Sequence, residues 1–231
     1  MKIFTLSFDD GVTQDRRFIG LLKKYGLTCT FNVNSALLGT EGEVITGKNQ
    51  SRVPHNKVEA CEVASLYDGF EVAVHTRTHP MLTGLSDADI LEQVVGDSVT
   101  LSSLAGYPVL GMAYPGGHPN YDRLVVDLLR KYTKIRYART IADTYALEFP
   151  SDFLMWNPSA HILDERADGL IDEYCAAQGD SLLYLWGHTY EMDVDDGWER
   201  AERVLSRLAN IKDAVCMTNM QVWEYAHTFR R

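Results

Sequence analysis

The sequence predicts an α/β protein, a distorted (β/α) barrel of about seven strands built as a single domain from residues 1–231. Short apolar or β-branched runs alternate with amphipathic stretches of helical length from one end of the chain to the other. Strands that alternate with helices in this way form right-handed βαβ units and a mainly parallel sheet. No internal repeat, linker or low-complexity segment interrupts the alternation, which argues against two domains.

In the first half of the chain, apolar and β-branched runs predict strands at residues 3–8, 28–33 and 71–74. Helical spacing of apolar residues predicts helices at residues 16–24 and 58–67. These helices stop at Gly26 and before Gly69, because glycine readily adopts the left-handed conformation that ends helices. Residues 39–54 are rich in Gly, Thr, Asn and charged residues, so we expect a loop or a small insertion there.

The second half of the chain continues the same alternation. Ser86, with Asp89 three residues later, resembles a capping box and predicts the start of a helix. Further strands are predicted at residues 109–113, 135–138, 182–186 and 214–217, and further helices at residues 121–132, 163–177, 197–209 and 220–227. In a β/α barrel the side chains that carry chemistry lie at the carboxyl ends of the strands, so polar residues at these ends are the candidates for a functional site.

Charge and composition exclude several classes of protein. The chain has 22 Lys+Arg against 32 Asp+Glu, a net charge of −10, and no basic stripe, so we expect neither nucleic acid nor a membrane as partner. No apolar run is long enough to span a membrane and no signal peptide is visible, so we expect a cytoplasmic protein. Four widely spaced cysteines favour reduced thiols over a disulfide or a thiolate metal site: Cys29, Cys61, Cys175 and Cys216.

Three predicted strand ends carry side chains that commonly bind metals. Asp9 and Asp10 follow the first strand, and both carboxylates reach one site only if the chain bends there, which Gly11 permits. A helix N-cap or an ordinary turn is the alternative reading of this motif. His75 and His79 follow the strand at residues 71–74, and one helical turn would place both rings on one face.

A third histidine, His188, follows the apolar strand at residues 182–186. Histidines are often ordinary core or surface residues, so its position at another strand end is what gives it weight. One carboxylate and two histidines form a set that zinc uses in hydrolases, and that iron(II) uses in oxygenases. A spare carboxylate and a distant histidine favour hydrolysis, because one group can take a proton and the other can return it.

Four ordered motifs at these strand ends resemble those of the polysaccharide deacetylases, the NodB-homology family of carbohydrate esterases. They lie at residues 5–11, 75–79, 113–117 and 185–188. The similarity covers nearly the whole chain and implies a single NodB-homology domain over residues 1–231, with the distorted barrel that the periodicity predicts.

The resemblance also implies roles for individual residues. Asp10, His75 and His79 would hold one divalent metal ion, zinc in most relatives, with cobalt, nickel or manganese as alternatives. Asp9 would be the base that takes a proton from the attacking water, and His188 the acid that protonates the leaving amine. The oxyanion and the substrate would contact residues of the third motif and a tryptophan further on: Tyr114, Pro115, Gly116 through its backbone N–H, and Trp156.

Two departures from the family pattern leave open how active the site is. Many relatives have an arginine at the position of Ala113, where it holds the base in place. No aspartate of a fourth motif is recognisable to support His188. Three residues are candidates for that support, although each is also typical of an ordinary surface or capping position: Asp152, His161 and Asp164. We assign no role to three further histidines: His55, His118 and His227.

These observations predict a metal-dependent deacetylase that removes an acetyl group, with N-deacetylation of a carbohydrate as the expected reaction. The alternatives are a deacylase acting on O-acetyl esters or non-sugar amides, and a catalytically inactive carbohydrate-binding relative. An iron(II) oxygenase is disfavoured, because such sites usually lie on antiparallel barrels. The expected partner is a carbohydrate or a small acetylated substrate, and the sequence does not predict an oligomeric state.

Overall fold

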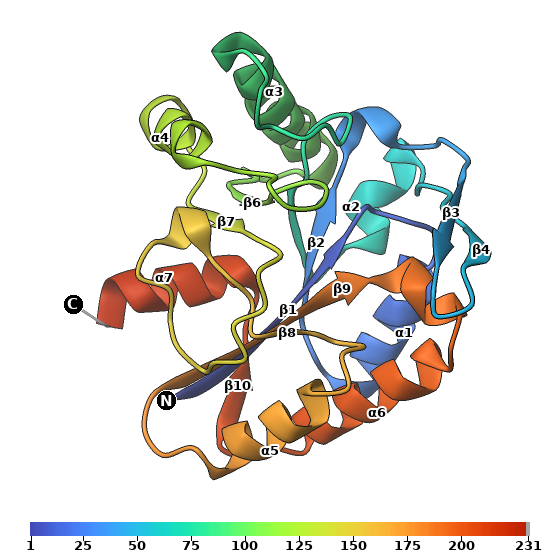
Figure 1. Cartoon of the computed structure of the whole chain (residues 1–231), viewed down its shortest axis with the longest axis vertical. Helices are drawn as coiled ribbons and strands as arrows, with labels where there is room; N and C mark the ends of the chain where they lie inside the picture. The colour runs from blue at the N-terminus through green and yellow to red at the C-terminus, as the bar shows by residue number, and fades with distance from the viewer. Residues whose placement is uncertain (230–231) are drawn as a thin grey trace.

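The computed structural model describes residues 1–229, and its centre is a curled sheet of eight strands. They are β1 (Lys2–Asp9), β2 (Thr30–Val33), β5 (Glu71–Val74), β6 (Gly111–Ala113), β7 (Tyr137–Arg139), β8 (Ala160–His161), β9 (Ser181–His188) and β10 (Ala214–Cys216). Seven follow the order β7-β6-β5-β2-β1-β9-β8, and β10 pairs with β1 (Figure 1). All of these pairs are parallel, so the carboxyl ends of the strands meet at one edge.

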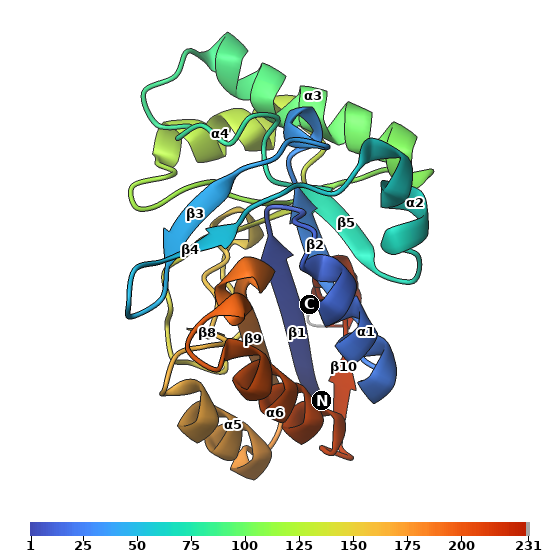
Figure 2. The same cartoon turned by 90° about the vertical axis from the view of Figure 1, so that its right-hand side faces the viewer.

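Seven α-helices of the described residues surround the sheet: α1 (Asp15–Tyr25), α2 (Val63–Leu66), α3 (Asp87–Ala105), α4 (Arg123–Tyr132), α5 (Ala167–Ala176), α6 (Gly197–Ala209) and α7 (Asn219–Phe229). Helices α5 and α6 lie on the side of β8 and β9, whereas α3 and α4 lie at the opposite end of the molecule (Figures 1 and 2). No helix among residues 1–229 is long and apolar enough to cross a membrane.

The predicted α/β architecture and its parallel barrel-like sheet are confirmed. Every residue of β1 is buried, because this strand lies in the middle of the sheet with neighbours on both edges. A single bridge between Arg139 and Trp156 links β7 to the segment that leads into β8. The sheet is therefore a curled half-barrel, with this segment crossing the gap between its two edge strands.

Three segments differ in detail from the sequence prediction. The expected insertion at residues 39–54 contains an antiparallel hairpin of β3 (Glu43–Thr46) and β4 (Ser51–Pro54). The helix expected at residues 58–67 is reduced to a 3₁₀ turn (Ala60–Glu62) and the single turn of α2, because Glu59 is extended, with φ −73° and ψ 145°, and caps the 3₁₀ turn. Strand β8 was not predicted, since two residues carry no periodicity. All four cysteines have free thiols.

Candidate active site

Strand register brings the predicted site residues to one edge of the sheet. Asp9 at the end of β1 is the register partner of His188 at the end of β9. On the other side, β2 pairs with both β1 and β5, and His75 follows the last residue of β5. Three motifs that lie far apart in the sequence therefore meet around the carboxyl end of β1 (Figure 2).

The bend that two adjacent carboxylates require occurs at Asp10 itself. Its φ of 82° and the φ of 58° at Gly11 are both in the left-handed region. A Cβ atom at Gly11 would lie 3.0 Å from Val33 Cγ1, so the close approach to β2 and the positive φ both favour glycine. This bend turns the Asp10 carboxylate to the same side as that of Asp9.

Asp10, His75 and His79 lie close enough together to share one metal ion. One ligand atom from each residue lies within 4.8 Å of the other two. Asp10 Oδ1 is 3.6 Å from His79 Nε2 and 3.8 Å from His75 Nε2. No helical turn brings the two rings together, contrary to the sequence expectation. Instead His79 is left-handed, with φ 61°, and the ring centroids are 4.9 Å apart.

Both rings are in the state that a metal ligand needs. His75 Nδ1 is 3.0 Å from the carbonyl oxygen of Ala113 and must donate its proton there, which leaves Nε2 free to coordinate. Burial lowers the pKa of His75 to about 4 and also lowers the pKa of His79, so neither ring is charged near neutral pH. One carboxylate and two neutral imidazoles fit a divalent metal such as zinc.

Asp9 is held beside this group by an arginine. The Arg139 guanidinium donates to both carboxylate oxygens, and Asn32 Nδ2 donates to Oδ1 at 2.8 Å. Asp9 Oδ2 is 3.9 Å from His75 Nε2 and 3.7 Å from His188 Nε2. Burial alone would raise the pKa of Asp9, but Arg139 and the two histidines outweigh it and keep the pKa below its ordinary value.

Arg139 is a residue that the sequence analysis missed. It is the register partner of Ala113 on the neighbouring strand β7, so the charge absent from position 113 is supplied one strand away. The Arg139 side chain is completely buried, which is rare for arginine without a paired carboxylate. An arginine one residue beyond the predicted strand 135–138 was the available signal, because the ends of parallel strands meet.

His188 is paired with Glu191, three residues further along the chain. Glu191 Oε2 is 3.2 Å from His188 Nδ1 and 2.8 Å from His161 Nε2. Burial alone would lower the pKa of His188, but the hydrogen bond and the charge of Glu191 raise it to about 9. The His188 ring is therefore positively charged at neutral pH, with a proton on each nitrogen: Nε2 faces Asp9 and Nδ1 faces Glu191.

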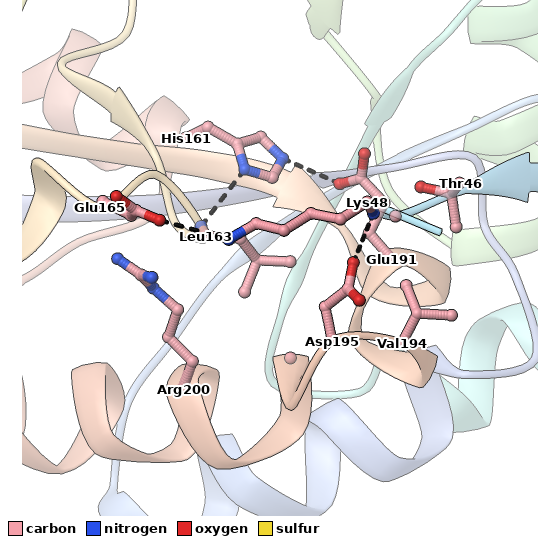
Figure 3. Close-up of a pocket in the computed structure, with 11 residues that line it drawn as sticks. Thr46, Lys48, His161, Leu163, Glu165, Glu191, Val194, Asp195 and Arg200 are labelled. Atoms are coloured by element: carbon pink, nitrogen blue, oxygen red, sulfur yellow. Dashed lines mark hydrogen bonds and ion pairs between the residues drawn. The ribbon is translucent and has the colours of Figure 1, made fainter. Parts of the chain in front are cut away.

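His161, His188 and Glu191 also lie within metal-binding distance of one another. However, His161 Nδ1 accepts the backbone N–H of Leu163 at 3.2 Å, so its Nε2 carries the proton and donates to Glu191. Hydrogen bonds therefore account for this cluster. His161 and Glu191 line a pocket of about 410 Å³ whose walls also include Lys48 and Arg200 (Figure 3).

Only one of the three residues expected to support His188 is near it. His161 reaches it through Glu191, whereas Asp152 pairs with Arg130 and Asp164 pairs with Arg166. Glu191 was not predicted, because the family resemblance implies an aspartate from a motif upstream of His188. Its signal was spacing: an acidic residue three positions after a histidine at a strand end lies within reach of that histidine.

His55, to which the sequence analysis assigned no role, lies beside Asp10 in the structure. His55 Nε2 is 3.1 Å from Asp10 Oδ2, and the Lys57 ammonium is 3.4 Å from Asp10 Oδ1. Burial alone would raise the pKa of Asp10, but these two neighbours keep it well below its ordinary value. The other two histidines lie elsewhere, His118 in an exposed loop and His227 against Trp223 in α7.

The aromatic substrate contacts predicted from the sequence are not at the surface. Trp156 is 1% exposed and packs against Tyr137, Tyr184 and Phe153, so its side chain belongs to the core. The Tyr114 side chain is fully buried. Neither ring can line a substrate pocket in this structure.

The backbone of the third motif remains at the active-site edge. Pro115 and Gly116 directly follow Tyr114 at the carboxyl end of β6, whose neighbour β5 leads to His75. Asn120 Nδ2 donates to the carbonyl oxygen of Gly116 at 3.1 Å and so fixes this loop.

Comparison with known proteins identifies the family. The polysaccharide deacetylase family model matches residues 1–135. A polysaccharide deacetylase from Bacillus cereus, BC0361, is 22% identical with a TM-score of 0.52; the match covers 66% of this chain but only 45% of BC0361. No curated protein sequence matches the chain at a significant level.

Two structures match over nearly the whole chain. A family 4 carbohydrate esterase from Streptomyces lividans, solved with acetate, is 16% identical with a TM-score of 0.55, covering 91% of this chain and 87% of its own. A family 4 acetyl xylan esterase from Clostridium thermocellum, solved with cobalt, is 14% identical with a TM-score of 0.60, covering 98% and 92%. These similarities show that the chain shares the fold of both esterases, and the match to the family model over more than half of the sequence places the chain in the polysaccharide deacetylase family.

Proposed function

We propose that the protein is a metal-dependent hydrolase that removes the acetyl group from an N-acetylated carbohydrate. Family membership supports deacetylase activity. The observation that carries the finer proposal is the position of Asp9 Oδ2, 3.9 Å from His75 Nε2 and 3.7 Å from His188 Nε2. A carboxylate thus stands between a candidate metal site and a protonated histidine, which is the order that general base and acid catalysis requires.

In this proposal Asp10, His75 and His79 hold the ion, with zinc as the first candidate and cobalt, nickel or manganese as alternatives. When bound, a divalent ion there would polarise the acetyl carbonyl and make the attacking water more acidic. The Nε2 atoms of both histidines and Asp10 Oδ1 point toward one another, and His79 is about one-third exposed, so substrate can approach from that side.

The protein's own groups then move two protons. Asp9, kept ionised and oriented by Arg139, accepts a proton from the attacking water. The backbone N–H of Gly116 donates a hydrogen bond to the carbonyl oxygen as it gains negative charge. His188 Nε2 gives a proton to the leaving nitrogen, and the carbon–nitrogen bond breaks. The products are acetate and a free amine.

Glu191 acts in this scheme as a positioning residue. Its carboxylate fixes the proton on His188 Nδ1, so that Nε2 faces the substrate side, and it stabilises the charged ring before proton transfer. His161 in turn donates to the same oxygen and holds Glu191 in place. The missing fourth-motif aspartate therefore does not by itself argue for an inactive protein.

Pairing of β1 with β10 supports the proposal that residues 1–231 form one domain, since the first and last strands share one sheet. Two alternative functions are compatible with the same site. An O-acetyl ester or a non-sugar amide would meet the same groups, and an inactive carbohydrate-binding relative would lack turnover altogether.

An acetate-release assay tests the proposal. The protein is freed of metal with a chelator, reloaded with zinc, cobalt, nickel or manganese, and offered N-acetylated oligosaccharides, O-acetylated sugars and simple acetamides. We expect acetate from N-acetylated sugars only after reloading, and at least about 10²-fold slower release by the Asp9→Asn variant. Acetate release that is equal with and without metal, or absent with every metal and substrate, would contradict the proposal.

A further inference from the structure

A buried lysine contacts the same oxygen atom that faces the two candidate metal-binding histidines. Lys57 Nζ donates to the backbone carbonyl of Asp10 at 2.8 Å and lies 3.4 Å from Asp10 Oδ1. The Lys57 side chain is only 4% exposed. Asp10 Oδ1 is also the atom within 3.6 Å and 3.8 Å of the Nε2 atoms of His79 and His75. The lysine and an ion at this site would therefore compete for one carboxylate oxygen.

The second oxygen of Asp10 does not relieve this competition. His55 Nε2 lies 3.1 Å from Asp10 Oδ2 and, because an ionised carboxylate only accepts, the ring must donate to it. Oδ2 is thus already hydrogen-bonded, and Oδ1 is the oxygen left to face the two histidines. Both His55 and Lys57 come from the segment after β4.

The segment that carries Lys57 is tied to the chain around Asp10. Val12 forms a β-bridge with Lys57. Val58 N–H donates to Gly11 O at 2.9 Å, and Thr13 N–H donates to Asn56 O at 2.8 Å. These two hydrogen bonds make up the bridge and flank the lysine, so its backbone is fixed beside Asp10, and its ammonium group is held there by the Asp10 carbonyl.

The charges of the site balance before any ion enters. Asp9 is paired with Arg139 and Asp10 with Lys57, two carboxylates against two cations, all of them buried. Buried charges need such partners, because burial of an unpaired carboxylate is costly. A divalent ion adds two positive charges next to Lys57, and like charges repel strongly where water is excluded.

We propose that Lys57 is a built-in counter-ion that competes with the divalent metal for Asp10 Oδ1. Lys57 stabilises the metal-free protein and weakens metal binding, and so sets the metal affinity of the site. This inference rests on the proposed metal site. An ordinary buried ion pair would contribute only to stability. Lys57 acts on stability and on metal affinity in opposite directions.

The test removes the positive charge of Lys57 and keeps a side chain of similar length. In Lys57→Met the apolar stem remains and the ammonium is lost. Lys57→Gln keeps a hydrogen-bond donor for the Asp10 carbonyl and provides a second variant should the first fold poorly. We expect both to melt at lower temperature than wild type when metal-free. We also expect both to bind Zn²⁺ at least about tenfold more tightly, measured by competition with a chromophoric chelator.

Two control variants isolate the effect of position and of charge. Lys2 is a matched buried lysine at the opposite end of β1, where Nζ donates to Cys175 O at 2.8 Å and pairs with Asp213 at 3.1 Å. Lys2→Met should lower the melting temperature and leave Zn²⁺ affinity unchanged. Lys57→Arg retains the charge and should bind Zn²⁺ no more tightly than wild type.

The outcomes separate this inference from the proposed function. If wild type binds one Zn²⁺ that His79→Ala loses, but neither charge-removing variant binds it more tightly, Lys57 is not a competitor and the inference is overturned. If wild type and His79→Ala bind Zn²⁺ equally, the metal site itself is misassigned. Tighter binding by Lys2→Met as well would show a general effect of net charge, which also overturns the inference.

Discussion

The site has a proposed metal side, Asp10, His75 and His79, from residues 10–79 of the chain, and a proposed acid side, His188 and Glu191, from its last fifth. The match to the polysaccharide deacetylase family model ends at residue 135 and so contains only the metal side. On that side the family spacing is kept. On the proposed acid side, the expected aspartate is not recognisable, and the Glu191 carboxylate pairs with His188 instead.

The two sides differ because metal ligands need a stricter geometry than the partner of a charged side chain. Metal ligands need three atoms at fixed mutual distances, and here they depend on left-handed backbone at Asp10 and His79. A charge partner only has to come within hydrogen-bond distance, so any neighbouring strand or turn can supply it. Arg139 and Glu191 are both substitutes of this kind.

The largest effects are expected on the metal side. Asp10→Ala, His75→Ala and His79→Ala should each lower metal content severely and abolish acetate release, because each removes one of three ligands. The fold should remain, since the extensive core does not depend on an ion. Metal analysis and circular dichroism of the purified variants check this. Stoichiometric metal in all three would rule out the assigned ligands.

Moving the arginine from position 139 on β7 to position 113 on β6 tests whether either strand can supply the charge that pairs with Asp9. Arg139→Ala should cost about 3–5 kcal/mol of stability and most of the activity, because it leaves Asp9 buried and unpaired. Ala113 is the register partner of Arg139, so the double variant Arg139→Ala/Ala113→Arg restores an arginine where many relatives have one. We expect partial recovery of melting temperature and kcat/KM. No recovery would mean that position 113 cannot reach Asp9 here.

A smaller loss is expected on the acid side from Glu191→Gln. Loss of such a supporting partner typically costs about 10–100-fold in activity. The variant should also lower the pKa of His188, so the alkaline limb of the kcat/KM profile should move to lower pH. Glu165→Gln is the matched control, because Glu165 lines the same pocket and pairs with Lys48 instead of His188 (Figure 3). Equal effects of the two variants would remove Glu191 from the positioning role.

The smallest expected effect is on stability as a function of pH. The pKa of His188 rises from 6.5 to about 9 on folding, so its contribution to stability is fully present below pH 6.5 and is lost as pH rises through 9. The pKa of Glu191 is lowered on folding, so its contribution is present above its ordinary value of 4.5 and is lost in acid. Denaturant unfolding of wild type and Glu191→Gln should therefore differ most between these limits. A difference that persists unchanged at pH 10 would contradict the pairing.

The sequence predicted what depends on local pattern. Alternating runs gave the order of strands and helices, and the barrel rule placed Asp9, Asp10, His75 and His188 at one edge. It did not predict contacts between β7 and β1 or within the turn after β9, because no periodicity encodes them. Arg139 and Glu191 were missed for that reason. Trp156 was misassigned because an aromatic residue packs equally well in a core and against a sugar.

In the proposed reaction Asp9 takes the first proton and His188 gives the second, and the dependence of the rate on the leaving group tests these two roles most directly. An amine needs a proton to leave, whereas an activated ester does not. We predict that Asp9→Asn lowers kcat/KM on an N-acetyl sugar and on an activated acetyl ester alike, by about 10²–10⁴-fold. His188→Ala should damage the amide reaction far more than the ester reaction, while both variants keep their metal. Equal losses on both substrates for His188→Ala would contradict its role as the acid.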